Sequence, residues 1–237
     1  MQQAVLPHRV AVYFAPAPES PWWQAGSRWL GRCAATAAAL PQTAIEGIDA
    51  ETFARLTAAP RRYGWHATLK APFRLAPDNN DALASLRAAL QGICSRQRAF
   101  ELPLRVACMG DFLALRPLQT PPELERLEAD CVQSLQPLAA QLGAGELARR
   151  RRAGLSAAQD ALLQAWGYPW VLQEFRFHFS LTGPLNGLAP VQREALLVAA
   201  ARQFHRLPAC PIDRLSLFAE PLAGADFELL QQMRLES

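Results

Sequence analysis

Two short runs with the same alternation constrain the fold of this 237-residue chain more than any other feature. In the first run, residues 63–72, the polar positions that alternate with apolar ones are His66, Thr68 and Lys70. In the second run, residues 175–184, they are Arg176, His178, Ser180 and Thr182. Successive side chains of a β-strand point to opposite faces. We therefore expect two strands, each with a buried apolar face and a polar face that carries a histidine.

The polar faces supply the groups that in-line cleavage of a phosphodiester requires. Two imidazoles that face each other across a cleft can act as acid and base near neutral pH, without a metal. One takes a proton from the attacking water or hydroxyl, and the other gives a proton to the leaving oxygen. The hydroxyls of Thr68 and Ser180 lie two residues beyond the histidines, where they can donate to a non-bridging phosphate oxygen. We predict His66 and His178 as the catalytic pair, and the residues leave open which is the acid.

Several neighbours are candidates for binding the substrate. Lys70 and Arg176 can balance the charge that develops in the transition state. Tyr13 and Tyr63 can face the same cleft, although a place in the core or on the cleft rim remains an alternative. The four arginines at residues 149–152 form either a solvated helix face or a clamp for a second substrate phosphate. No clustered Cys, His or Asp motif appears, so we predict no metal site.

The composition is that of a globular protein and excludes several classes of function. Hydrophobic residues make up 51% of the chain, which argues against long disorder, and the net charge of +3 is too small for a nucleic-acid coat protein. The five cysteines are scattered without a C-x-x-C pair, which favours reduced thiols. No run approaches the roughly 18–20 apolar residues of a membrane span, and we see no secretory signal. We expect a soluble, cytoplasmic protein.

Hydrophobic periodicity and turn residues predict the remaining elements. Helices are expected at residues 21–30, 50–56, 78–96, 121–142, 156–166 and 191–204. Strands are expected at residues 9–15, 100–108, 112–116 and 212–218, with a strand or an irregular terminal segment at 227–235. Each histidine run precedes a helix and two strands. We therefore predict a single domain of two lobes over residues 1–237, with a helical insertion at about 121–166.

The two motifs resemble the paired HxTx and HxSx signatures of the 2H phosphoesterase superfamily. In this chain they are His66-Ala67-Thr68-Leu69 and His178-Phe179-Ser180-Leu181. The longer stretches RRYGWHATLKAPF and EFRFHFSLTGPL are similar to one bacterial branch, the DUF1045 proteins, which are associated with phosphonate degradation. So are RVAVYFAP, GDFLALRP and ELARRRRAGLS. The resemblance thus spans nearly the whole chain, and a serine in the second motif is a variation that the superfamily pattern allows.

The resemblance implies a fold and an activity. The fold is α+β and bilobal, with two antiparallel sheets and flanking helices around a central cleft that holds both motifs. The activity is that of a metal-independent phosphodiesterase without a cofactor. His66 and His178 are then the acid/base pair, and Thr68 and Ser180 bind phosphate. For this branch, the implied substrate is a cyclic phosphodiester of a phosphorylated ribose, formed as the carbon–phosphorus bond of a phosphonate is broken.

Two other functions remain open from the sequence. The first is RNA-end processing, by a 2′,3′-cyclic phosphodiesterase or a 2′-5′ ligase-like enzyme. The second is a non-catalytic module that binds nucleotide or RNA. The modest net charge argues against long nucleic acid, and the intact pairs of histidine and hydroxyl argue against a module without catalysis. We expect a small phosphorylated sugar or nucleotide as the binding partner and no membrane, and we leave the oligomeric state open.

Overall fold

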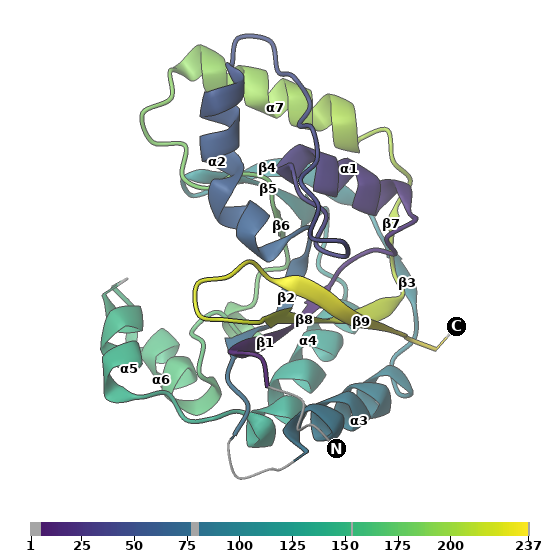
Figure 1. Cartoon of the computed structure of the whole chain (residues 1–237), viewed down its shortest axis with the longest axis vertical. Coiled ribbons are helices and arrows are strands. Elements are labelled where there is room, and N and C mark those ends of the chain that lie inside the picture. The colour runs from purple at the N-terminus through teal and green to yellow at the C-terminus, as the bar shows by residue number, and fades with distance from the viewer. Residues whose placement is uncertain (1–5, 77–80, 153, 237) are drawn as a thin grey trace.

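The described residues of a computed structural model, 6–76, 81–152 and 154–236, form two antiparallel sheets (Figure 1). Within these residues the larger sheet has seven strands in the order β4-β5-β6-β2-β1-β8-β9. In that order they are β4 (Leu104–Met109), β5 (Phe112–Pro117), β6 (Phe179–Ser180), β2 (Ala67–Phe73), β1 (Arg9–Phe14), β8 (Arg214–Glu220) and β9 (Glu228–Arg234). The small sheet pairs β3 (Phe100–Leu102) with β7 (Cys210–Ile212).

Helices flank the larger sheet on two sides. They are α1 (Pro21–Leu30), α2 (Ala50–Tyr63), α3 (Ala82–Cys94), α4 (Pro122–Leu135), α5 (Ala144–Arg151), α6 (Ala157–Trp166) and α7 (Pro190–Phe204). In Figure 1, α1, α2 and α7 lie together at the top, α3 and α4 lie at the bottom, and α5 with α6 projects to the left. This arrangement confirms the predicted α+β class with two antiparallel sheets and flanking helices. The grouping into two lobes with a helical insertion stays a prediction.

Most predicted elements are present, with changed boundaries. Ser20 is the N-cap of α1, as predicted, and Ser156 is the N-cap of α6. The helix predicted at 121–142 ends as α4 at Leu135, and a short 3-10 turn containing Pro137 follows it. The helix predicted at 78–96 is α3, and residues 77–80 lie outside the described residues. Hydrophobic periodicity alone does not locate the residue at which a helix begins or ends, so the boundaries differ.

Two of the predicted strands differ from those in the structure. The strand predicted at 100–108 is divided, because Pro103 separates β3 from β4 and the two strands pair with different partners. The second histidine run contributes only the two residues of β6 to the ladder. Its alternation is nevertheless real, since Phe177 and Phe179 are buried while the side chains between and after them are partly exposed. The pattern therefore predicted the faces of an extended segment more accurately than its hydrogen bonds.

Helix α2 is longer than predicted and connects the first histidine run to the second. The helix continues past Pro60 to Tyr63. Proline has no N–H for the carbonyl four residues back in a helix. That carbonyl, of Leu56, instead accepts a hydrogen bond from the backbone N–H of Gly183 at 2.7 Å. The predicted helix end at residue 56 is therefore wrong, and the proline frees an acceptor that holds the chain just beyond the second motif.

The apolar face of the sheet packs against the helices through a stack of aromatic rings. The ring centroid of Trp65, just before β2, lies 4.7 Å from that of Phe179 in β6 and 5.4 Å from that of Phe204 in α7. Helix α1 crosses this stack at Gly26, where a Cβ atom would lie 1.9 Å from the Trp65 indole. Because Trp65 and Phe179 each adjoin a motif histidine, the stack holds both motifs against one core.

We predict that Gly26→Ala destabilises the protein. The added methyl group displaces Trp65, and overpacking of this kind costs about 1–3 kcal/mol of unfolding free energy. Urea unfolding followed by tryptophan fluorescence measures the change. Gly92→Ala is the matched control, because Gly92 lies in α3 and the nearest atom to its Cβ is a terminal nitrogen of Arg96 at 3.5 Å. Alanine there should stabilise by about 0.5–1 kcal/mol, and equal effects at both positions would contradict the close packing of Gly26 on Trp65.

Candidate active site

The two histidine motifs lie side by side on neighbouring strands of the larger sheet. The bridge between these strands joins two residues in antiparallel register, Ala67 and Phe179. Extending the register by one residue in each direction gives two further opposite pairs, Thr68 with His178 and His66 with Ser180. Since alternate side chains point to opposite faces, all four share the face away from the aromatic stack. The sequence predicted which side chains share a face, and the structure adds that the two faces are continuous.

Each histidine ring is held by the same kind of backbone contact. Nδ1 of His66 lies 2.8 Å from the carbonyl oxygen of Gly64, and Nδ1 of His178 lies 2.7 Å from the carbonyl oxygen of Arg176. A carbonyl oxygen only accepts, so Nδ1 carries the hydrogen in both rings and donates it. Nε2 is therefore the nitrogen of each ring that remains to exchange a proton with a substrate.

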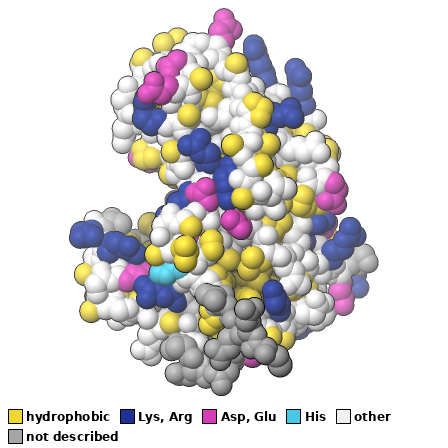
Figure 2. All heavy atoms as spheres, viewed as in Figure 1, with side chains coloured by type: hydrophobic (Ala, Val, Ile, Leu, Met, Phe, Trp, Pro, Cys, Tyr) yellow, Lys and Arg dark blue, Asp and Glu magenta, His cyan; other side chains and the backbone are white. Residues whose placement is uncertain are grey.

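The motif residues line two adjoining cavities. The first contains His66 and Ser180 in its wall and has a volume of about 420 Å³. The second contains His178 and has a volume of about 550 Å³. Thr68 and Tyr168 line both cavities. Figure 2 shows the molecule hollowed on its left side, between the part that carries α2 and the α5–α6 arm, with Lys and Arg side chains on both sides of the hollow. Cavities of this size hold small-molecule ligands.

Burial keeps both imidazoles neutral at pH 7. It lowers the pKa of His66 to about 4, an effect that the Gly64 carbonyl opposes and a charge on His178 strengthens. Burial also lowers the pKa of His178, and there the Arg176 carbonyl opposes the effect while the charge of Arg116 adds to it. The larger of the two shifts is at His66. The free site therefore offers two bases, of which His178 is the easier to protonate.

Tyr13 and Tyr63, both predicted as candidate substrate-binding residues, lie in the cavity of His66. The ring centroid of Tyr13 is 3.9 Å from that of His66, and the ring centroid of Tyr63 is 6.0 Å from it. Tyr13 is fully buried, and burial raises the pKa of its hydroxyl well above the ordinary value. It therefore remains a neutral donor that packs on the His66 ring and restricts its rotation.

Lys70 does not share the polar face, contrary to the alternation of the sequence. Val12 of β1 pairs with Lys70, whereas the next residue, Tyr13, pairs with Thr68. Leu69 is thus an extra residue on β2 and forms a β-bulge. The bulge turns Lys70 onto the face of Val12, which is the face that packs against the helices. The predicted position of Lys70 was wrong because strict alternation holds only where each residue of β2 pairs with one residue of β1, and the bulge interrupts that pairing.

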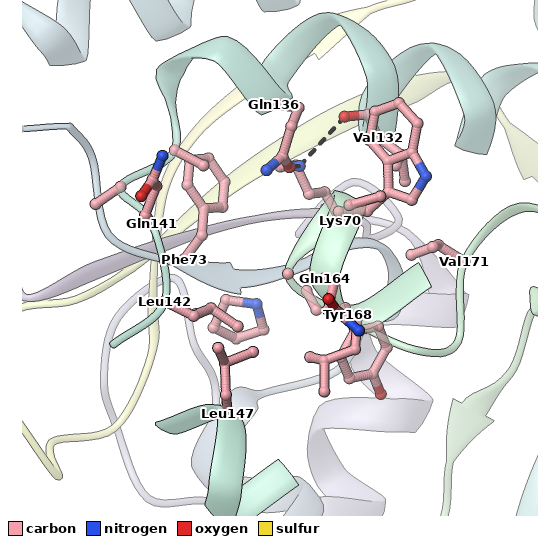
Figure 3. A pocket seen from close by; sticks show the side chains of 18 residues that line it. Lys70, Phe73, Val132, Gln136, Gln141, Leu142, Leu147, Gln164, Tyr168 and Val171 are labelled. Carbon is pink, nitrogen blue, oxygen red and sulfur yellow. Dashed lines mark hydrogen bonds between the residues drawn. The ribbon is translucent and has the colours of Figure 1, made fainter. Parts of the chain in front are cut away.

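The Lys70 ammonium is held by helix α4 instead of facing His66. Its Nζ donates to the carbonyl of Val132 at 3.2 Å and to Oε1 of Gln136 at 3.1 Å, in a third cavity (Figure 3). Its side chain is 4% exposed, and burial lowers its pKa to about 8. The structure therefore does not bring Lys70 together with His66, and a role in substrate binding stays a prediction.

Two arginines face the cavity of His178. Arg176, a predicted candidate, is exposed and lines this cavity. Arg116 of β5 lines it too, and the sequence analysis missed it. The signal was present, since Arg116 alternates with the buried Leu113 and Leu115. Both guanidiniums lie where they can offset negative charge on a bound phosphate.

Further polar residues line the cavity of His66. Arg9 and Arg150 line its cavity, and Arg150 comes from the arginine run at 149–152. Tyr168, which follows α6, lines the cavity as well. The signal for Arg9 was present, since it alternates with Val10 and Val12 and shares the face of Tyr13. Periodicity gave none for Tyr168, because its position depends on how the α5–α6 arm approaches the sheet.

The described residues offer neither a cluster of metal ligands nor a helix that could span a membrane. They contain no group of three or more His, Cys, Asp or Glu side chains that could hold a metal ion. None of their helices combines the length and the apolar character that crossing a bilayer requires. All five cysteines are free thiols.

Comparison with known proteins assigns most of the chain to one family. The family described as "Protein of unknown function (DUF1045)" matches residues 68–228. The chain is 42% identical over 223 residues to the ribose 1,5-bisphosphate phosphokinase PhnN of Janthinobacterium sp. (strain Marseille). It is 40% identical over 223 residues to the protein of the same name from Laribacter hongkongensis (strain HLHK9). These matches cover 92% and 93% of this chain but 49% and 50% of the relatives, so the chain spans about half their length.

Solved structures show a more distant similarity. E. coli LigT complexed with NADP+ aligns with a TM-score of 0.47 and 15% identity, over 98% of this chain and 100% of LigT. A crystal structure of a phosphoesterase aligns with a TM-score of 0.43 and 13% identity, over 98% of this chain and 100% of that chain. Similarity this remote supports no conclusion about activity.

Proposed function

Since the chain belongs to the DUF1045 family, as its sequence resemblance predicted, we propose an activity from the site itself. The family is described only as being of unknown function. The protein is a metal-independent phosphodiesterase of the 2H type that hydrolyses a cyclic phosphodiester. Its substrate is the cyclic phosphate of a phosphorylated ribose, and His66 and His178 are its catalytic residues.

One observation carries this proposal. Both histidines bond through Nδ1 to the carbonyl two residues back, which leaves two Nε2 atoms for proton transfer. Their strands are neighbours through a single bridge, and the cavities that the two histidines line share Thr68 in their walls. Two matched proton-transfer groups beside two hydroxyls are what in-line displacement at one phosphorus uses.

The unequal pKa values of the histidines support one assignment of roles. His66, whose pKa is lowered to about 4, stays neutral and acts as the general base. Water attacks phosphorus, its proton passes to His66 Nε2, and a P–O bond to the water oxygen forms. The opposite P–O bond of the ring breaks, and His178 Nε2 gives its proton to the departing sugar oxygen. The negative charge of the bound phosphate raises the share of protonated His178, and Thr68 and Ser180 donate to the non-bridging oxygens.

The names of the relatives support a ribose substrate. They are called ribose 1,5-bisphosphate phosphokinases, yet this chain has no G-x-x-x-x-G-K-[ST] loop for the phosphates of ATP, since its one lysine, Lys70, follows Leu69. We assign the kinase reaction to the half of the relatives that this chain does not span. Hydrolysis of 5-phosphoribosyl 1,2-cyclic phosphate at the bond to O2 yields ribose 1,5-bisphosphate, the compound in the relatives' name.

We predict that the purified protein opens 5-phosphoribosyl 1,2-cyclic phosphate in the presence of EDTA, as followed by phosphorus NMR. His66→Ala and His178→Ala should each lower kcat/KM by about 10²–10⁴-fold, because each removes a general acid or base. His205→Ala is the matched control. Nε2 of His205 accepts a hydrogen bond from the backbone of Val106 at 3.3 Å, and this residue lines neither cavity.

Four other results would change or contradict the proposal. Activity that EDTA abolishes would contradict the metal-independent mechanism. Full activity of both histidine variants would contradict the site. Faster opening of a 2′,3′-cyclic phosphate at an RNA end would identify RNA ends as the substrate in place of the ribose phosphate. Binding of both compounds without turnover of either would identify a non-catalytic module.

A second prediction tests the assignment of acid and base. In an acyclic p-nitrophenyl phosphodiester, the leaving group needs no proton. His178→Ala should therefore lose much less activity on this ester than on the cyclic substrate, whereas His66→Ala should lose activity on both. The measurement is the ratio of kcat/KM on the cyclic substrate to kcat/KM on the p-nitrophenyl ester for each variant. If His66→Ala spares activity on the ester and His178→Ala does not, His66 is the acid and His178 the base.

The pH profile of the wild-type protein checks the same assignment. With the cyclic substrate, kcat/KM should rise as the pH falls through the pKa of His178, which lies below the ordinary 6.5, because the acid becomes protonated. It should fall again near pH 4, where His66 takes up a proton. With the p-nitrophenyl ester the upper limb should disappear. An upper limb that persists with this ester would contradict His178 as the acid.

A further inference from the structure

One member of the arginine run at residues 149–152 is directed into the cavity of His66. The side chain of Arg150 is 16% exposed, and it lines this cavity. The side chain of Arg149, one residue earlier on α5, is 62% exposed. Arg151 pairs with Asp160 of α6. The structure thus separates the two interpretations of the run. Of its four arginines, all of them described, Arg149, Arg151 and Arg152 are exposed and only Arg150 lines the cavity.

The guanidinium of Arg150 is fixed on one side and lacks a partner on another. Its Nη2 donates to Oε1 of Glu146 at 2.8 Å, and its Cζ lies 5.9 Å from the ring centroid of Tyr168. Its Nε is buried and finds no hydrogen-bond partner among the described residues. A buried donor of a charged group is unfavourable while it remains unpaired. The protein therefore satisfies this guanidinium only in part, and Arg150 lines a cavity in which a ligand oxygen can accept from a terminal donor.

Positive charge exceeds negative charge in the wall of this cavity. Its charged residues, among those that the structure describes, are Arg9, Arg150 and Asp111. The carboxylates that pair with the two arginines are shared with other guanidiniums. Glu146, the partner of Arg150, also lies within 4.0 Å of Arg74 and Arg149, and Glu220, the partner of Arg9, also pairs with Arg62. The excess of positive charge favours an anion with more than one negative charge, since the histidines beside it are neutral.

We propose that Arg150, with Arg9, binds a second phosphate of the substrate, the phosphomonoester that is not hydrolysed. The inference rests on the proposed function and names the residues that select a phosphorylated sugar. The cyclic phosphate lies between the histidines and the two motif hydroxyls, and the 5-phosphate of the ribose reaches Arg150. The planar guanidinium suits phosphate oxygens, and a lysine does not reproduce its geometry.

Two substrates and two variants test this subsite. The substrates are ribose 1,2-cyclic phosphate with and without the 5-phosphate, and the variants are Arg150→Ala and the control Arg149→Ala, which loses a guanidinium from the same Glu146. Arg150→Ala should raise KM for the 5-phosphorylated substrate about 10- to 100-fold, the effect of losing charge-assisted hydrogen bonds. It should lower kcat/KM for the unphosphorylated substrate by a much smaller factor. Arg149→Ala should change neither, and Arg150→Lys should restore only part of the loss.

A binding measurement separates this inference from the proposed activity. Ribose 5-phosphate, titrated calorimetrically into the wild type and both variants, should bind the wild type and Arg149→Ala alike and Arg150→Ala about 10- to 100-fold more weakly. If the wild type opens neither substrate but this pattern holds, the proposed function fails and the phosphate subsite stands. Equal binding by all three proteins, or an equal loss by Arg150→Ala on both cyclic substrates, would overturn the subsite.

Discussion

The antiparallel pairing of Ala67 with Phe179 is the contact on which the rest of the site depends. A slip of one residue between two strands turns every side chain of one strand to the other face. Such a slip here would carry one histidine motif into the core and its aromatic residues into the cavity. Contacts away from the polar face fix the register, since Trp65 stacks on Phe179 and the Leu56 carbonyl binds Gly183 just beyond the second motif. The arrangement of the candidate site therefore relies on packing away from its polar face.

Much of the candidate site could be predicted because the alternation of a strand is a local property. Large apolar residues at every second position of 175–181 are buried together on one side, so the intervening His178 and Ser180 lie on the other. The same argument placed His66 and Thr68, and all four residues line the two cavities. Helix ends with clear caps were predicted equally well for the same reason, since the signal and the structure are neighbours in sequence.

The parts that could not be predicted depend on residues far apart in the sequence. The bulge that removes Lys70 from the polar face arises from its pairing with β1. Pro60 would normally interrupt a helix, but the carbonyl it frees finds a donor in Gly183. The selection of Arg150 from four consecutive arginines depends on how α5 approaches the cavity. Arg9 and Arg116 are exceptions, because the alternation of each with buried apolar residues was visible in the sequence.

The central claim is that both imidazoles act on one phosphorus atom, and a crystal structure of the protein with vanadate and ribose 5-phosphate tests it most directly. Vanadate adopts the five-coordinate geometry of in-line displacement. We predict that Nε2 of His66 and Nε2 of His178 each lie within about 2.6–3.2 Å of opposite apical oxygens of the same vanadate, the reach of a proton-transfer hydrogen bond. A vanadate that contacts only one of the two rings, or that binds in another cavity, would contradict the account.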